Sequence, residues 1–119
     1  MFKEHKEFHS VCLDEGWASP EGYPENIQEK ILSGYLDEEN KKGTRTRLLR
    51  FLPGAMTEDP FIHDYFEEVY LVSGDLTVGK GEKKEEFYPN TYASRPPQTY
   101  HGPFSSKDGC ILLEIHFYE

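Results

Sequence analysis

Short stretches in which apolar and polar residues alternate are the main pattern along this chain. They cover residues 27–36, 44–52, 67–72, 75–78 and 110–118, and charged or Gly/Pro-containing segments separate them. Alternation with a period of two is typical of strands that bury one face. Hardly any segment shows the 3.6-residue period of an amphipathic helix. The pattern therefore predicts an all-β fold, a sandwich or barrel of short strands.

The stretch PGAMTEDPFIHDYFEEVYLVSG, residues 53–74, combines such a strand with two metal-binding residue types, His63 and Glu67. In one straight strand these residues would be about 13 Å apart. The run VYLV is β-branched and aromatic, which disfavours a helix, so we expect a bend at residues 64–66. Glu67, Val69 and Leu71 then share one face. A carboxylate there is either solvated at the strand start or serves as a ligand.

Two further strands carry ionisable residues whose direction the alternation leaves open. In 44–52 Arg50 shares a face with two leucines, and an inward guanidinium would need an anionic partner or substrate, whereas at a rim it would form a salt bridge. In 110–118 Ile111, Leu113, Ile115 and Phe117 form one set, and Cys110, Leu112, Glu114 and His116 form the other. Glu114 or His116 could act as general acid or base if it points inward.

Length and charge narrow the class of protein. A chain of 119 residues fits one domain, with residues 1–16 as a polar N-terminal arm that packs on a sheet or on a partner subunit. The 22 acidic and 13 basic side chains give a net charge of -9, which argues against nucleic acids and anionic membranes as partners. Cys12 and Cys110 have no close Cys or His partner and are expected to be free thiols. Without a secretory signal or membrane-length apolar window, a cytoplasmic protein is expected.

Two segments resemble the motifs of the cupin superfamily. HDYFEEVYLVSG, residues 63–74, resembles the first motif, and RPPQTYHGPFSSKDGC, residues 95–110, resembles the second in its ChrR-like form. Trp17, LLRFLPG at 48–54 and YPNTYASRPP at 88–97 are also similar to that subgroup. The resemblance implies a cupin double-stranded β-helix, a jelly-roll barrel, over residues 17–119. It also implies metal ligands at His63, Glu67 and His101.

Two positions depart from the family pattern. The family has a further His two residues before the one at position 63, and here Phe61 stands there; Gln98 replaces a Gly before His101. The remaining donors are those of a site for one divalent ion, Fe, Mn, Ni or Zn. Losing a ligand weakens such a site, so a metal-free pocket is the alternative. Asp59, Asp64 and Tyr65 are the nearest replacement donors.

By resemblance, the pocket of such a cupin chelates a small oxygenated organic molecule on the metal. This implies an enzyme of the dioxygenase or bond-cleaving type, with a homodimer as the expected assembly. Tyr65 and Tyr100 are the candidate catalytic groups, and Phe61, Arg50 and Arg95 the candidate substrate contacts. A ligand sensor of the ChrR-like type and a metal-free binding module remain the alternatives, since one fold hosts many functions.

Overall fold

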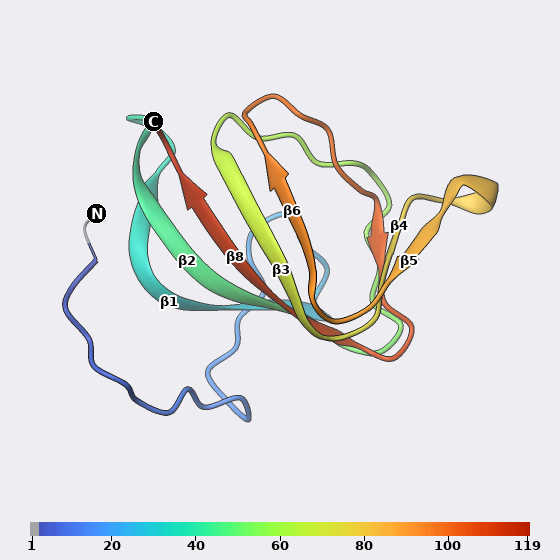
Figure 1. The fold of residues 1–119 in the computed structure, drawn as a ribbon, viewed down its shortest axis with the longest axis horizontal. Coiled ribbons are helices and arrows are strands. Elements are labelled where there is room, and N and C mark those ends of the chain that lie inside the picture. Colours follow the sequence, from blue (N-terminus) through green and yellow to red (C-terminus); the bar gives the residue numbers. More distant parts are fainter. Residues whose placement is uncertain (1–2) are drawn as a thin grey trace.

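The computed structural model describes residues 3–119, so Met1 and Phe2 of the predicted arm lie outside the described residues. The described residues form two antiparallel sheets, ordered β1-β2-β8-β3-β6 and β5-β4-β7 (Figure 1). The elements are β1 (Ile27–Asp37), β2 (Lys42–Phe51), β3 (Phe66–Gly74), β4 (Leu76–Val78), the 3-10 turn η1 (Gly81–Lys83), β5 (Glu85–Phe87), β6 (Thr91–Arg95), β7 (Phe104–Ser105) and β8 (Cys110–Phe117). The all-β prediction is confirmed. Within residues 3–119, no helix has the length and apolar character needed to span a bilayer.

The predicted strand stretches correspond closely to β1, β2, β3, β4 and β8, whereas β5, β6 and β7 were not predicted. β3 begins at Phe66, directly after a bend at Asp64 and Tyr65, one residue shorter than the bend predicted at residues 64–66. It ends at Gly74, whose φ is 85° and where an added Cβ would lie 1.9 Å from the carbonyl oxygen of Gly109. Only glycine fits that approach. This close contact sets β3 beside the start of β8.

The inner face of the larger sheet carries both the apolar core and a set of charged residues. Glu67, Val69 and Leu71 of β3 share one face, as the alternation predicted, and all three are buried, so Glu67 is not solvated at the strand start. In β8 the inward-facing residues are the set that contains Glu114 and His116. Both side chains therefore point inward, which a role as general acid or base requires. The core cluster consists of Ile27, Leu49, Phe51, Ala55, Val69, Leu71, Leu76, Cys110 and Leu112.

Strand β2 buries the face opposite to the one that carries Arg50. Its buried residues are Arg47, Leu49 and Phe51. Arg50 lies on the outer face, where its guanidinium stacks on Trp17 at 4.2 Å and donates to Gln28 and to the carbonyl oxygen of Leu13. A contact between Arg50 and a ligand inside the barrel is thus contradicted, because alternation fixes which residues share a face but not which face is buried.

The N-terminal arm runs along the outside of the sheets (Figure 1). Residues 3–16 are exposed, and their contacts to the domain include Lys3 Nζ to Thr46 Oγ1 at 2.5 Å and Lys6 Nζ to the Leu32 carbonyl oxygen at 3.2 Å. Both lysines reach β1 or β2 on the outer side. The homodimer in which this arm would contact a partner stays a prediction.

Candidate metal centre and pocket

Three predicted metal ligands come together from three separate segments. His63 lies in the loop before β3, Glu67 is the second residue of β3, and His101 lies between β6 and β7. One nitrogen or oxygen atom of each lies within 4.8 Å of the others. Two backbone hydrogen bonds between Phe61 and His101, of 2.7 and 2.9 Å, join the two loops, and Gln98 N–H donates to the His63 carbonyl oxygen at 2.7 Å.

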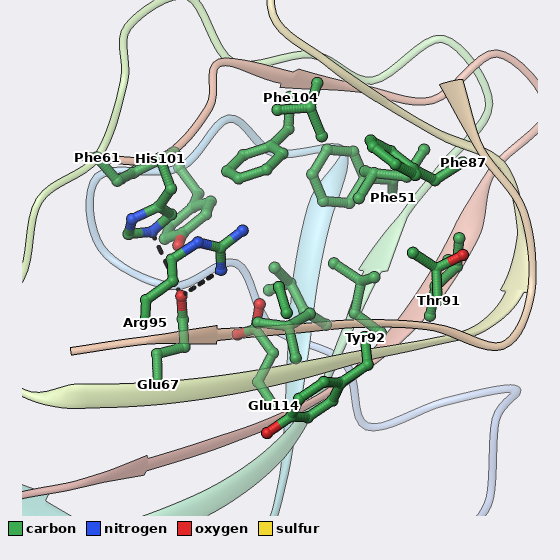
Figure 2. A pocket seen from close by; sticks show the side chains of 18 residues that line it. Phe51, Phe61, Glu67, Phe87, Thr91, Tyr92, Arg95, His101, Phe104 and Glu114 are labelled. Atoms are coloured by element: carbon green, nitrogen blue, oxygen red, sulfur yellow. Dashed lines mark hydrogen bonds and ion pairs between the residues drawn. The ribbon is translucent and has the colours of Figure 1, made fainter. Parts of the chain in front are cut away.

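Both imidazoles of this group are held neutral. Burial lowers the pKa of His63 to about 4 and lowers the pKa of His101, with the Glu67 carboxylate opposing the shift in each case. The ring of His101 donates from Nδ1 to the Thr99 carbonyl oxygen at 3.2 Å. Its Nε2 lone pair therefore points at Glu67 Oε1, 3.4 Å away, as Figure 2 shows. Two electron-pair donors at this distance, with no proton between them, suit a shared cation.

The Glu67 carboxylate is fixed from two sides. Arg95 Nη1 donates to its Oε1 at 3.0 Å, and His116 Nε2 lies 2.8 Å from its Oε2. Arg45 Nε donates to His116 Nδ1 at 3.1 Å, so the His116 proton is on Nε2 and is donated to Glu67. Burial lowers the pKa of His116 to about 3, which keeps this ring neutral. These contacts orient the carboxylate without using all of its lone pairs.

A second group of donors, Glu67, Glu114 and His116, is less suited to a cation. Glu114 Oε1 accepts from Arg47 Nε at 2.8 Å, and the remaining lone pair of His116 faces Arg45. Arg47 also donates to Glu29 Oε1 at 2.8 Å, so one buried guanidinium joins two carboxylates. The second group is a network of paired charges, whereas His63, Glu67 and His101 offer unused lone pairs.

A cavity of about 220 Å³ opens beside Glu67 and His101 and extends between the two sheets (Figure 2). At one end it is lined by polar groups, among them Arg95, Glu114 and the phenol of Tyr23. Burial raises the pKa of Tyr23 to about 12, so the phenol stays protonated at neutral pH. Beyond them the wall is apolar, with residues of both sheets: Leu49, Phe51, Val69, Leu71, Leu76, Val78, Phe87, Phe104 and Leu112.

Phe61 belongs to the wall of this cavity. Its ring stacks on Tyr23 with centroids 5.0 Å apart and lies 6.0 Å from His101 and 6.2 Å from His63. The benzyl group thus stands beside the donors as apolar surface, and the cavity remains open next to it.

The other predicted site residues differ in their placement. Arg95 lines the cavity beside Glu67. Tyr65 is buried behind the donors, stacked on His63 at 4.5 Å, and does not line the cavity. Tyr100 is 71% exposed, so a role as acid or base inside the cavity is contradicted. Of the replacement donors, Asp59 is exposed, and Asp64 is bound to Lys41 and Tyr118.

Sequence reasoning missed three residues of the site, namely Tyr23, Arg45 and Arg47. Tyr23 lies in a Pro/Gly-rich passage whose turn, closed by its own N–H to the Pro20 carbonyl oxygen at 3.2 Å, carries no motif. Arg45 and Arg47 share a face with Leu49 and Phe51. Glu114, at the matching position of the last strand to Arg47, was the available signal, since buried charges occur in pairs.

Solved structures with the same fold include cupins. An RmlC-like cupin from Shewanella frigidimarina is 18% identical with a TM-score of 0.69, covering 100% of this chain and 96% of that one. The acetylacetone dioxygenase of Acinetobacter johnsonii is 19% identical with a TM-score of 0.66, covering 98% and 78%. The polyketide cyclase RemF of Streptomyces resistomycificus is 18% identical with a TM-score of 0.70, covering 98% and 81%. The chain therefore has the cupin jelly-roll fold.

The family of this chain is shown by a match to a family model. The model of the family described as "Domain of unknown function (DUF4437)" matches residues 13–114, and the chain belongs to that family. The comparison with curated proteins gave no match. At the identities above, the likeness to the dioxygenase and to the cyclase defines the fold and not the reaction. Membership of the ChrR-like subgroup stays a prediction.

Proposed function

We propose that this protein is a metal-dependent cupin enzyme in which His63, Glu67 and His101 hold one divalent ion. A small oxygenated organic molecule would bind that ion from the cavity side. The main support is the pair formed by the neutral Nε2 of His101 and the Glu67 oxygen, 3.4 Å apart. The nearby His63 ring, also neutral, supplies the third donor.

The donor set suits Fe, Mn, Ni or Zn, since two imidazoles and one carboxylate leave several coordination positions open. A bound ion would act as a Lewis acid toward an oxygen of the chelated molecule. The chain contributes a fixed carboxylate, held by Arg95 and His116, and a protonated phenol at Tyr23 that can donate a hydrogen bond or proton to the substrate. Dioxygenation and bond cleavage are the two reaction types we propose.

Metal analysis of protein purified without chelators and then offered ferrous iron and manganese tests this proposal. We expect about one equivalent of metal per chain, with His63→Ala and His101→Ala each removing it. His9→Ala is the matched control, because His9 lies in the exposed arm. Less than about a tenth of an equivalent in the unmodified protein, or equal retention in all three variants, would refute the site.

The reaction is tested separately by oxygen uptake. Ferrous protein is given a panel of β-diketones, with His101→Ala as the control. Uptake that depends on His101 supports a dioxygenase. Stoichiometric metal without uptake would leave bond cleavage, followed by product analysis, as the reaction of the same site.

A second candidate function, a metal-free ligand-binding module, is favoured by two observations. Both oxygens of Glu67 already accept hydrogen bonds, one from Arg95 and one from His116. Phe61 also occupies a position where the family pattern has a ligand. If this candidate is correct, a small-molecule ligand binds equally well in the presence and absence of EDTA.

A further inference from the structure

We infer that the ligand of this cavity is a small organic anion with an apolar body, whose head lies at Glu67 and Arg95 and whose body lies between the two sheets. The anionic head rests on the proposed function, because it follows from the charge of the bound metal. The apolar body rests on the cavity wall alone. The two parts can therefore be tested separately.

The charge argument starts from the polar end of the cavity. Glu67 and Glu114 line that end, and Glu29 is joined to Glu114 through Arg47. The guanidiniums that contact these carboxylates or His116 are Arg45, Arg47 and Arg95. These three negative and three positive groups balance. His116 accepts from Arg45 at Nδ1 and faces Glu67 with Nε2, which is the pattern of a neutral ring, and the imidazoles of His63 and His101 offer lone pairs to a metal only as neutral rings. A divalent ion adds an excess of two positive charges in a place shielded from water. Uncompensated buried charge is costly, so an anionic ligand is favoured over a neutral one.

The apolar argument concerns the other end of the cavity. Its wall there consists of hydrocarbon side chains, including Phe51, Leu71, Leu76, Val78 and Phe87. A hydroxyl group placed against them would lose its hydrogen bonds to water, which costs about 1–3 kcal/mol for each group. A polyol or sugar is therefore disfavoured, and an aryl or alkyl group is favoured.

The size of the ligand is limited as well. The cavity volume of about 220 Å³ is below the range of roughly 300–1,000 Å³ that is usual for drug-sized ligands. A single ring with a short acidic side arm is of suitable size. Such a molecule would reach from Arg95 to the apolar wall.

Calorimetric titration of zinc-loaded protein with three probes tests the inference. The probes are 3-phenylpropanoate, 3-phenylpropan-1-ol, which lacks the charge, and gluconate, which has the charge but a polar body. We expect 3-phenylpropanoate to bind at least about tenfold more tightly than either of the others. Equal or tighter binding of gluconate overturns the apolar body, and equal binding of the alcohol overturns the anionic head.

Zinc content, measured on the same samples, separates this inference from the proposed function. One equivalent of zinc with a preference for gluconate overturns the inference and leaves the metal site intact. Absence of zinc, together with absence of iron and manganese in the metal analysis described above, refutes the proposed function and, with it, the anionic head. A preference of that zinc-free protein for the two phenyl probes over gluconate would still support the apolar body.

Cavity-filling variants test where the body lies. Ala93→Phe adds a ring to the cavity from β6, and Ser94→Phe adds the same ring to the outer face of the same strand. We expect Ala93→Phe to weaken 3-phenylpropanoate binding at least about tenfold while zinc content is unchanged, and Ser94→Phe to leave both unchanged. Val78→Phe fills the cavity from the smaller sheet and serves if Ala93→Phe does not fold. Unchanged affinity in the filled variants overturns the placement.

Discussion

The inner face of the larger sheet has a charged half and an apolar half, and the same strands build both. Across four strands the register aligns Arg45, His116, Glu67 and Arg95 in one row, and Leu49, Leu112, Leu71 and Thr91 in another. The row between them contains Arg47, Glu114, Val69 and Ala93. Each strand thus changes from charged to apolar within four residues.

The two halves contribute differently to the protein. Burying the leucines and Phe51 stabilises the fold by about 25 cal/mol for each Å² removed from water. Paired buried charges contribute little, because their attraction is offset by the loss of hydration, yet breaking one pair is costly. The apolar half therefore holds the barrel together, and the charged half is best explained by the donor group that it orients.

The largest expected effect is the loss of Arg47 from the charged half. Arg47→Met leaves the buried carboxylate of Glu114 without its guanidinium, which we expect to lower the free energy of unfolding by about 3–5 kcal/mol. Urea denaturation at pH 7.5 measures it. Arg50→Met, on the outer face of the same strand, is the control and is expected to cost about 1 kcal/mol or less. The double variant Arg47→Met with Glu114→Leu should recover part of the lost stability. Equal losses in Arg47→Met and Arg50→Met would contradict a buried charged half.

The next expected effect is on the pH dependence of the free energy of unfolding, which should come from the charged half and not from the apolar half. The pKa of His116 is about 3 in the folded protein against 6.5 normally, so between these values the unfolded chain binds more protons. The stability associated with neutral His116 is present above pH 6.5 and is lost as the pH falls toward 3, about 2 kcal/mol of it by pH 5. Denaturation at several pH values in EDTA measures this loss.

Two variants show whether that loss comes from the charged half. His116→Gln should flatten the pH dependence by about one proton, because an amide does not titrate in this range. Leu112→Ala should lower stability by about 2–4 kcal/mol at every pH and keep the slope. A slope unchanged by His116→Gln would assign the acid sensitivity to other groups.

The smallest effect concerns the backbone at the two ends of β6. Asn90, before the apolar end, has φ of 73°, and Gln98, after the charged end, has φ of 65°. Asn adopts this left-handed region at a lower energetic cost than Gln does. We therefore expect Gln98→Gly to raise the free energy of unfolding by about 0.5–1 kcal/mol and Asn90→Gly to change it less. Thermal and urea denaturation of both variants would check this, and a loss of stability in Gln98→Gly would contradict strain at the charged end.

The sequence predicted those features that depend on local pattern or on motif spacing. Five of the strands, the bend before Phe66 and the shared face of Glu67, Val69 and Leu71 all follow from alternation and strand propensity. The grouping of His63, Glu67 and His101 was predicted from the motifs, and the structure brings a donor atom of each within 4.8 Å of the others.

What the sequence could not decide was which way a strand with two partly apolar faces would turn. β2 offers Leu48 and Arg50 on one face and Arg47 and Leu49 on the other, and both patterns look alike. Pairing with β8, which brings Glu114 opposite Arg47, settles the choice through a contact 67 residues apart in the chain. The prediction that Tyr100 is a catalytic group was wrong for a related reason, since proximity to His101 in the chain does not fix the direction of a loop side chain.

The reciprocal backbone bridge between Phe61 and His101, together with the hydrogen bond from Gln98 to His63, makes the two donor loops one mechanical unit. A designer who wished to move this centre into another barrel would have to transplant both loops at once, because either loop alone would lose the backbone hydrogen bonds that position its imidazole. A substitution that shifts the backbone of one motif during evolution should likewise shift the imidazole of the other.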